Sequence, residues 1–290
     1  MAIDREAYRL RTLAQGVYRA WWDDARVRVV SVILGSVLLV SGCAGVTRQV
    51  DVPRAPSPHD TGRRITNVSG YLTKPDGGGP FGAVVLLHGC PGLPPAYKRL
   101  MEWAEWYRVR GWVSIAIDSF APRGLSIVCN AATATDRAGD AYAAMRYLAE
   151  QPFVKKDRVV VHGMSHGGWT VLRALDESMY GGEPLRFAAG IAYYPVCANM
   201  GRPLYAPGIV LIGELDDTPP GAPCRELGNA SRGDSHPIEV TIYPGAYHAF
   251  DFAAPRRVND FGMVLEYSPA ATADAEQRVD AFLRRLFPRP

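Results

Sequence analysis

One ten-residue run, residues 159–168, constrains the fold of this chain more than any other. β-branched residues lead into Gly163-Met-Ser165-His-Gly167, and a helix-like segment follows. The pattern Gly-x-Ser-x-Gly between a buried strand and a helix predicts a sharp turn with the serine at its apex. The glycines leave room where side chains would collide. The run therefore predicts a nucleophile elbow that presents Ser165.

Strand-like and helix-like segments alternate along the rest of the chain. We expect helices over residues 97–110, 138–150 and 273–287. We expect strands over residues 65–73 (an edge strand), 83–87, 112–117, 158–161, 187–194, 209–212 and 238–243. This alternation predicts an α/β fold with a mostly parallel, doubly wound sheet and helices on both faces. In such a sheet, ligands bind beyond the carboxyl ends of the strands.

Composition limits the classes of function. The chain has 290 residues, is 48% hydrophobic and 21% charged, and fits one globular domain with an appendage. The net charge of +3 comes without a lysine-rich run, so a nucleic-acid partner is not indicated. The glycine-rich residues 75–80 lack the Lys-Ser/Thr of a phosphate loop, and we interpret them as a turn.

The N-terminal segment is typical of a targeting signal. Arg26 and Arg28 precede an apolar stretch over residues 29–40, which is short for a membrane span. The sequence Val-Ser-Gly-Cys43 resembles the lipobox of bacterial lipoproteins. The resemblance implies a leader over residues 1–42, lipidation of Cys43 and a membrane-anchored domain in the cell envelope, facing the periplasm. The alternative is an uncleaved signal anchor.

Proline governs the next segment. Pro53, Pro56 and Pro58 alternate with polar residues, and no apolar period is visible over residues 43–64. We therefore expect a tether there and a single folded domain over residues 65–290.

The serine needs a base and an acid, which should follow later strands in the order Ser, Asp or Glu, His. His248 follows the last predicted strand in a glycine-containing loop, and we expect it to be the base. Three carboxylates follow the strand over residues 209–212. We favour Asp216 over Asp217 and Glu214, because Asp216 lies between Gly213 and Pro220.

An oxyanion hole needs two backbone N–H donors, one after the nucleophile and one after an early strand. His166 follows the serine, and Cys90 lies in the loop after the strand over residues 83–87. Pro91 has no N–H to donate. We therefore expect the N–H groups of Cys90 and His166 to bind the oxyanion.

Four cysteines remain when Cys43 is set aside, namely Cys90, Cys129, Cys197 and Cys224. An even number suits an oxidising compartment, and three pairings are possible. Cys197 and Cys224 each follow a predicted strand and could meet at one rim of the sheet. Buried free thiols are the alternative.

Several motifs together resemble the dienelactone hydrolase family of the α/β-hydrolase superfamily, over residues 65–288. The motifs lie at residues 70–75, 87–93, 118–124, 163–167, 213–217 and 243–251. Family members carry cysteine in the elbow where this chain has Ser165, which favours a general carboxylic ester hydrolase over a dienelactone-specific one. Arg123 is either a clamp for a substrate carboxylate or part of a structural loop.

The predicted function is hydrolysis of a small ester or lactone through an acyl-enzyme on Ser165, without a metal or an organic cofactor. The alternatives are a peptidase or thioesterase with the same triad. A non-catalytic envelope lipoprotein is a third possibility, but such a protein would be expected to lack a triad member.

Overall fold

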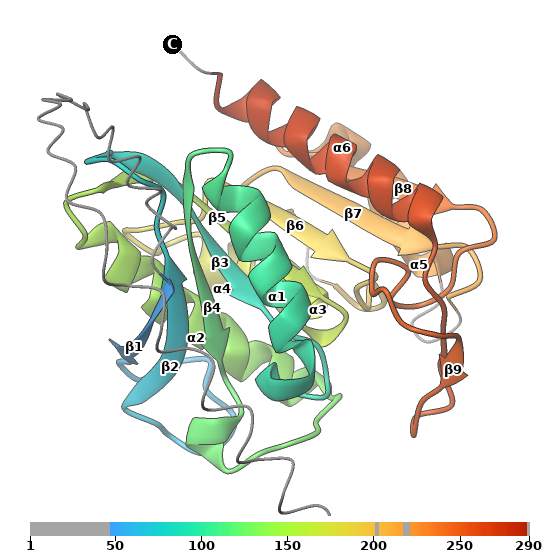
Figure 1. Cartoon of the computed structure of the whole chain (residues 1–290), viewed down its shortest axis with the longest axis horizontal. Coiled ribbons are helices and arrows are strands. Elements are labelled where there is room, and N and C mark those ends of the chain that lie inside the picture. The colour runs from blue at the N-terminus through green and yellow to red at the C-terminus, as the bar shows by residue number, and fades with distance from the viewer. Residues whose placement is uncertain (1–46, 201–202, 217–220, 289–290) are drawn as a thin grey trace, which may run out of the picture. The chain divides into compact units, whose positions relative to one another are not determined.

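The computed structural model describes residues 47–200, 203–216 and 221–288. The predicted leader over residues 1–42 and the predicted lipidation site Cys43 lie outside these ranges. Within the described ranges, no helix is long and apolar enough to cross a membrane. The domain is built on an eight-stranded sheet in the order β1-β2-β4-β3-β5-β6-β7-β8 (Figure 1).

The strands of this sheet are β1 (Thr47–Pro53), β2 (Asn67–Thr73), β3 (Phe81–Leu87), β4 (Trp112–Asp118), β5 (Val154–Met164), β6 (Ala189–Tyr193), β7 (Gly208–Gly213) and β8 (Ile238–Tyr243). A separate two-stranded sheet joins β9 (Arg257–Val258) and β10 (Val264–Leu265). The α-helices are α1 (Leu93–Arg108), α2 (Ala131–Ala149), α3 (His166–Ala174), α4 (Glu177–Tyr180), α5 (Gly221–Ala230) and α6 (Pro269–Leu286).

The sheet is parallel from β4 to β8, and β1 and β2 are antiparallel to their neighbours. Helices α1 and α6 cover the face toward the viewer in Figure 1, and α2 and α3 lie behind the sheet. The central strand β5 carries Val159, Val160 and Val161, whose side chains are fully buried. β-branched residues suit a strand covered on both faces. The predicted α/β fold with a mostly parallel, doubly wound sheet is confirmed.

The prediction of a tether over residues 43–64 is wrong for residues 47–60. Residues 47–53 form β1, the true edge strand, which pairs with β2 in the register Val50↔Gly70 and Val52↔Val68. The strand predicted at the edge is therefore an inner one. Only Val50 and Val52 alternate on the buried side of β1, and this short alternation is obscured by the prolines that follow.

Arg54 attaches the segment after β1 to the domain. It is 4% exposed, and its Nε donates to Asp140 on α2 at 2.5 Å. Its Nη1 donates to Asp60 at 2.8 Å. Buried charges are tolerated when they are paired in this way, so residues 54–60 are held by ion pairs that composition does not reveal.

Helix α2 begins at Ala131, seven residues before the predicted start at residue 138. Asn130 caps it, because its side chain accepts a hydrogen bond from the N–H of Thr133 at 2.9 Å. The first two turns are rich in alanine and threonine and carry little apolar periodicity, which explains the difference.

Candidate active site

Ser165 lies between β5 and α3 in the predicted elbow conformation. Its φ of 56° and ψ of −119° place it in a region that side chains rarely adopt. A Cβ on Gly163 would collide with the backbone of Gly167, and one on Gly167 would collide with the carbonyl of Leu87. The N–H of Ser165 donates to the carbonyl of Tyr193 at 2.9 Å. Glycines and the neighbouring strand thus fix the strained turn.

His248 lies in the loop after β8 and contacts both predicted partners. Its Nε2 lies 3.0 Å from the Oγ of Ser165, and its Nδ1 lies 2.8 Å from the Oδ2 of Asp216. Because a carboxylate only accepts, Nδ1 carries the proton and Nε2 is free to accept from the serine hydroxyl. This is the arrangement that general-base activation of a serine requires.

Asp216 is the carboxylate that meets the imidazole, and its side chain is fully buried. Glu214 instead accepts from the N–H of Gly245 at 3.2 Å, at an exposed position. Asp217 lies outside the described residues. The loop that carries Asp216, which we call the acid loop, is hydrogen-bonded to the loop that carries His248, since the N–H of Leu215 donates to the carbonyl of Ala246 at 2.9 Å. The preference for Asp216 over Glu214 agrees with this geometry.

The segments that carry the two predicted oxyanion donors both lie next to the serine. His166 is the first residue of α3, where a helix leaves backbone N–H groups without an intrahelical acceptor. The loop after β3 passes close to Ser165, because a Cβ on Gly89 would lie 3.4 Å from the Cβ of Ser165. Gly89 and Cys90 line the same pocket as Ser165.

Arg137 on α2 connects the two oxyanion segments and is fully buried. Its Nη2 donates to the carbonyl of His88 at 2.6 Å, and its Nη1 donates to the Nδ1 of His166 at 2.6 Å. The other ring nitrogen, Nε2, then carries the proton and donates to the carbonyl of Asn130 at 2.9 Å. One buried guanidinium therefore holds both segments that carry a predicted donor.

Burial, followed by the nearby Arg137 cation, lowers the pKa of His166 to about 3. Its imidazole therefore stays neutral and remains an acceptor for Arg137. Burial also lowers the pKa of Arg137 itself to about 9. Sequence reasoning missed Arg137, because nothing in its neighbourhood on α2 distinguishes it from a surface arginine.

Two disulfides join segments that follow the carboxyl ends of β3, β4, β6 and β7. Cys90 is bonded to Cys129 and Cys197 to Cys224, so the suggested meeting of Cys197 and Cys224 is confirmed. The first bond joins the predicted donor Cys90 to the segment that also accepts from His166. The N–H of Val128 adds a hydrogen bond to the carbonyl of Cys90 at 3.1 Å.

A second buried network lies beneath His248. The ring of Tyr194 packs edge-on against His248 with centroids 4.7 Å apart. The Tyr194 hydroxyl donates to Asp251 at 2.6 Å, and Asp251 accepts from the Nε of Arg99 at 2.9 Å. Burial raises the pKa of Tyr194 well above its ordinary value, so the hydroxyl stays a donor. The network fixes the wall on which the imidazole rests.

A pocket of about 130 Å³ opens onto Ser165 and His248. Part of its wall comes from the excursion between His248 and α6 that carries β9 and β10, which sequence reasoning left unassigned. Most of the lining is apolar: Pro91, Pro95, Ala96, Met164, Tyr194, Ala249, Phe252, Phe261, Met263 and Leu265. Arg99, Arg257 and Asn259 add polar groups. The pocket fits a small, mostly apolar acyl or alcohol group.

Arg123 does not line this pocket. Its two Nη atoms donate to Asp140 at 2.7 and 2.9 Å, and Nη1 also donates to the carbonyl of Ser119 at 2.8 Å. Asp140 therefore occupies both Nη atoms of the guanidinium, which a substrate carboxylate would need for bidentate binding. Of the two interpretations of Arg123, the structure supports the structural one and contradicts the substrate clamp.

Solved structures share this fold at low identity. The chain matches the protein m3DLH with 20% identity and a TM-score of 0.64, covering 84% of this chain and 100% of that one. It matches esterase 2 of Thermogutta terrifontis, phosphorylated by paraoxon, with 17% identity and a TM-score of 0.60, covering 83% and 94%. It also matches dipeptidyl peptidase 4 of Porphyromonas gingivalis with 16% identity and a TM-score of 0.58, covering 83% and 35%.

No curated protein sequence matches the chain. A family model, however, matches residues 68–287, which include every strand of the main sheet from β3 onward, the six α-helices of the described residues and both loops that meet Ser165. The family is described as the dienelactone hydrolase family. The chain belongs to the dienelactone hydrolase family and is a hydrolase that acts on ester bonds.

Proposed function

We propose that this protein is a serine carboxylic ester hydrolase in which Ser165, His248 and Asp216 form the catalytic triad. The observation that carries the proposal is the unbroken hydrogen-bond chain from Ser165 through His248 to Asp216, at 3.0 and 2.8 Å. The chain ends at the mouth of an apolar pocket. A histidine with a purely structural role is not expected to form a hydrogen bond with a strained serine at the mouth of a pocket.

The reaction proceeds by acyl transfer. The Nε2 of His248 takes the proton of Ser165 as the Oγ attacks the ester carbonyl, and Asp216 stabilises the imidazolium that forms. The N–H groups of Cys90 and His166 stabilise the oxyanion. His248 then gives the proton to the leaving alkoxide, and a water activated by the same imidazole hydrolyses the acyl-enzyme. No step needs a metal or an organic cofactor.

The pocket favours a small ester or lactone as substrate. Its volume of about 130 Å³ leaves room for a short acyl chain rather than a long one. Dipeptidyl peptidase 4 of Porphyromonas gingivalis shares the fold, so the fold does not separate esters from amides. The mostly apolar lining, as far as the described residues form it, suits the acyl group of a small ester.

We also propose that the protein is a lipoprotein of the cell envelope, anchored through Cys43, with its catalytic domain facing the periplasm. The lipobox-like sequence before Cys43 supports this, and the two disulfides suit an oxidising compartment. Mass spectrometry of the mature N-terminus tests it. A diacylated Cys43 is expected, whereas an intact leader would indicate a signal anchor instead.

The catalytic proposal is tested by the hydrolysis of short-chain p-nitrophenyl esters, with matched thioester and peptide substrates. The full chain is compared with Ser165→Ala and His248→Ala. We expect ester turnover that falls at least about 10³-fold in both variants. An inactive, folded wild type would indicate a non-catalytic lipoprotein, and faster turnover of the thioester or peptide would reassign the substrate class.

A further inference from the structure

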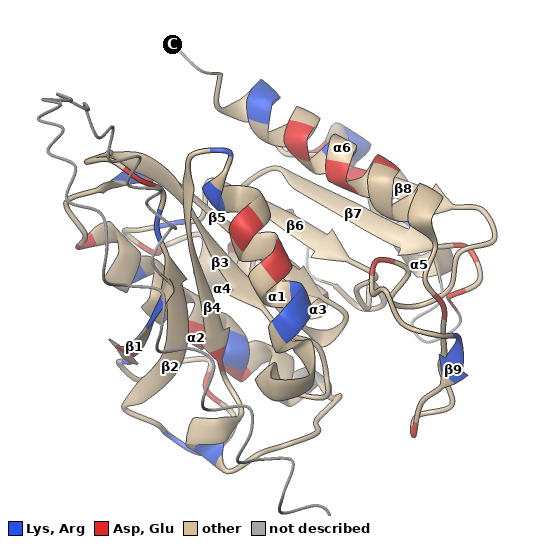
Figure 2. Cartoon of the chain, viewed as in Figure 1, with Lys and Arg blue, Asp and Glu red and all other residues tan. Residues whose placement is uncertain are grey.

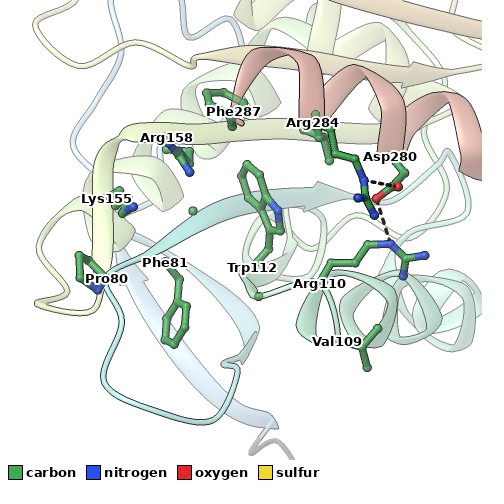
Figure 3. Close-up of a pocket in the computed structure, with 13 residues that line it drawn as sticks. Pro80, Phe81, Val109, Arg110, Trp112, Lys155, Arg158, Asp280, Arg284 and Phe287 are labelled. Atoms are coloured by element: carbon green, nitrogen blue, oxygen red, sulfur yellow. Dashed lines mark hydrogen bonds and ion pairs between the residues drawn. The ribbon is translucent and has the colours of Figure 1, made fainter. Parts of the chain in front are cut away.

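A larger hollow of about 420 Å³ lies where β3, β4 and β5 begin. We call this end of the parallel strands the amino edge of the sheet; Ser165 lies at the opposite end, the carboxyl edge. Figure 3 shows its residues arranged between the starts of these strands and the end of α6. No part of the proposed triad lines it. The catalytic mechanism therefore leaves this hollow unexplained.

Aromatic side chains form the wall of the hollow. Trp112 and Phe287 meet edge-on with centroids 5.5 Å apart. Phe81 also lines the hollow, but its ring points away from these two rings (Figure 3). Gly82 makes room, since a Cβ there would lie 2.6 Å from the Trp112 ring. Trp112 and Phe287 are partly exposed, so they offer an apolar surface to a partner.

Cations surround this aromatic wall. Arg110 and Arg284 share one acid, Asp280, at 3.3 and 2.7 Å. Arg158 lies over the ring of Phe287, 5.2 Å from its centroid, and neither it nor Lys155 forms an ion pair with a described residue. Four cations against one acid leave a charge of +3 in the lining, so the hollow favours an anionic partner.

The chain enters the domain at this same edge. Thr47, the first described residue, pairs with Thr73, which pairs with Ser114 on β4, two residues beyond Trp112. Cys43 lies four residues before Thr47. Four residues span at most about 14 Å, which limits the distance from the proposed lipid to the start of β1. The active-site pocket lies at the carboxyl ends of the strands, away from this edge.

We propose that this hollow, which we call the basic-aromatic pocket, binds the phosphate of an anionic phospholipid in the membrane that holds the N-terminal anchor. Arg158 and Lys155 pair with the phosphate, and Trp112 and Phe287 lie at the depth of the headgroups, where aromatic and basic side chains are enriched. Figure 2 shows basic positions near the ends of α1 and α6 that frame the same edge. The catalytic pocket then faces away from the bilayer.

This inference rests on the proposed N-terminal anchor and not on the chemistry at Ser165. The test uses the full chain in nanodiscs of phosphatidylcholine alone or of phosphatidylcholine with phosphatidylglycerol, and measures amide hydrogen exchange. We expect slower exchange over residues 80–82, 109–112, 155–158 and 283–287 only in the anionic discs. Exchange over residues 252–265, in the catalytic pocket, should be the same in both.

The double variant Lys155→Gln/Arg158→Gln should lose this protection, since each cation near an anionic surface contributes a factor of about five to binding. Lys98→Gln is the matched control, because Lys98 is an exposed cation on α1 at the catalytic edge, and it should keep the protection. Ester hydrolysis in the same discs reports separately on the triad, so the two proposals fail independently.

Three outcomes would overturn the inference. A chain that does not co-elute with the discs has no anchor, and protection over residues 252–265 instead would reverse the orientation. Equal protection in phosphatidylcholine discs on addition of inorganic phosphate would assign the basic-aromatic pocket to a soluble anion rather than to a lipid.

Discussion

The two edges of the sheet present their polar side chains in opposite ways. At the carboxyl edge, His248, Asp216 and Arg137 are at most 4% exposed and hydrogen-bonded. At the amino edge, Lys155 and Arg158 are partly exposed and lack an acidic partner among the described residues. The comparison indicates that the first edge is preorganised for a reaction and the second is suited to a reversible contact.

Preorganisation has an energetic cost. An arginine without solvent needs several acceptors to remain charged, and Arg137 finds only neutral ones, the carbonyl of His88 and the ring of His166. Such an arrangement is useful where two backbone segments must be held in one geometry. At the amino edge, no two backbone segments need to be held in one geometry by these cations, and Lys155 and Arg158 remain in contact with water.

The acid loop gives the largest expected effect. Asp216→Asn should lower kcat/KM by about 10⁴-fold, because the imidazole loses the acceptor that sets its tautomer. Glu214→Gln should stay within about twofold of wild type, since Glu214 makes one exposed hydrogen bond to the N–H of Gly245. Steady-state ester hydrolysis measures both. Equal losses in the two variants would break the distinction between a buried and an exposed carboxylate.

Arg137 tests whether the buried network positions the oxyanion hole. Arg137→Met should lower kcat by about 10²-fold with KM nearly unchanged, the signature of an interaction made in the transition state. Arg137→Lys should recover part of kcat through one remaining hydrogen bond. Arg123→Met is the control, because Arg123 binds Asp140 and not the oxyanion segments. Arg123→Met should lower the melting temperature and leave kcat unchanged. A rise in KM with kcat unchanged in Arg137→Met would contradict the role of Arg137 in positioning the oxyanion hole.

The two disulfides sharpen the comparison within the catalytic edge. They close loops of similar length, with sequence separations of 39 and 27, so removing either should cost about 4 kcal/mol of unfolding free energy by the chain-entropy estimate. Only Cys90→Ser/Cys129→Ser should also lower kcat, by about tenfold, because Cys90 carries a predicted oxyanion donor. Cys197→Ser/Cys224→Ser should lower stability alone. Denaturant unfolding and kinetics of both double variants separate the effects.

Buried neutral histidines predict acid sensitivity of the fold. Burial lowers the pKa of both His166 and His162 to about 3, whereas the unfolded side chains titrate near 6.5. The unfolded state therefore binds more protons between these values, and each histidine destabilises the fold by up to about 1.4 kcal/mol per pH unit below 6.5. Unfolding free energies measured at pH 7 and pH 5 should show the loss, and equal values would contradict it.

The amino edge gives the smallest expected effect on catalysis. Lys155→Gln/Arg158→Gln should change kcat/KM by less than about twofold and the unfolding free energy by less than about 0.5 kcal/mol. Ester hydrolysis is measured in detergent. A larger loss of activity would show that the cations of the amino edge affect catalysis at the carboxyl edge, which contradicts the independence of the two edges.

Much of the proposed site follows from the sequence, because its residues lie at predictable strand ends. Ser165, His248 and Asp216 each follow a recognisable parallel strand, and the order of the three residues limits the choices. The fold class follows from the alternation of strands and helices. These signals are local, so a single sequence carries them.

The features that escaped prediction depend on contacts between distant segments. Arg137 acquires its role only when α2 packs against the elbow, and Tyr194 only when Asp251 and Arg99 meet it from two other segments. The two interpretations of Arg123 could be separated only by finding Asp140 in its fork. The edge strand β1 was not predicted for another reason. Two alternating valines are a weak signal beside three prolines.

Covalent labelling tests the central claim, that Ser165 is a nucleophile activated by His248. Esterase 2 of Thermogutta terrifontis shares this fold and is phosphorylated by paraoxon, so paraoxon is a suitable probe of the full chain, with peptide mass spectrometry as the readout. We predict a single diethylphosphoryl group on Ser165, absent from Ser165→Ala and formed much more slowly in His248→Ala. A folded protein that takes no label, or takes it on another residue, would contradict the account.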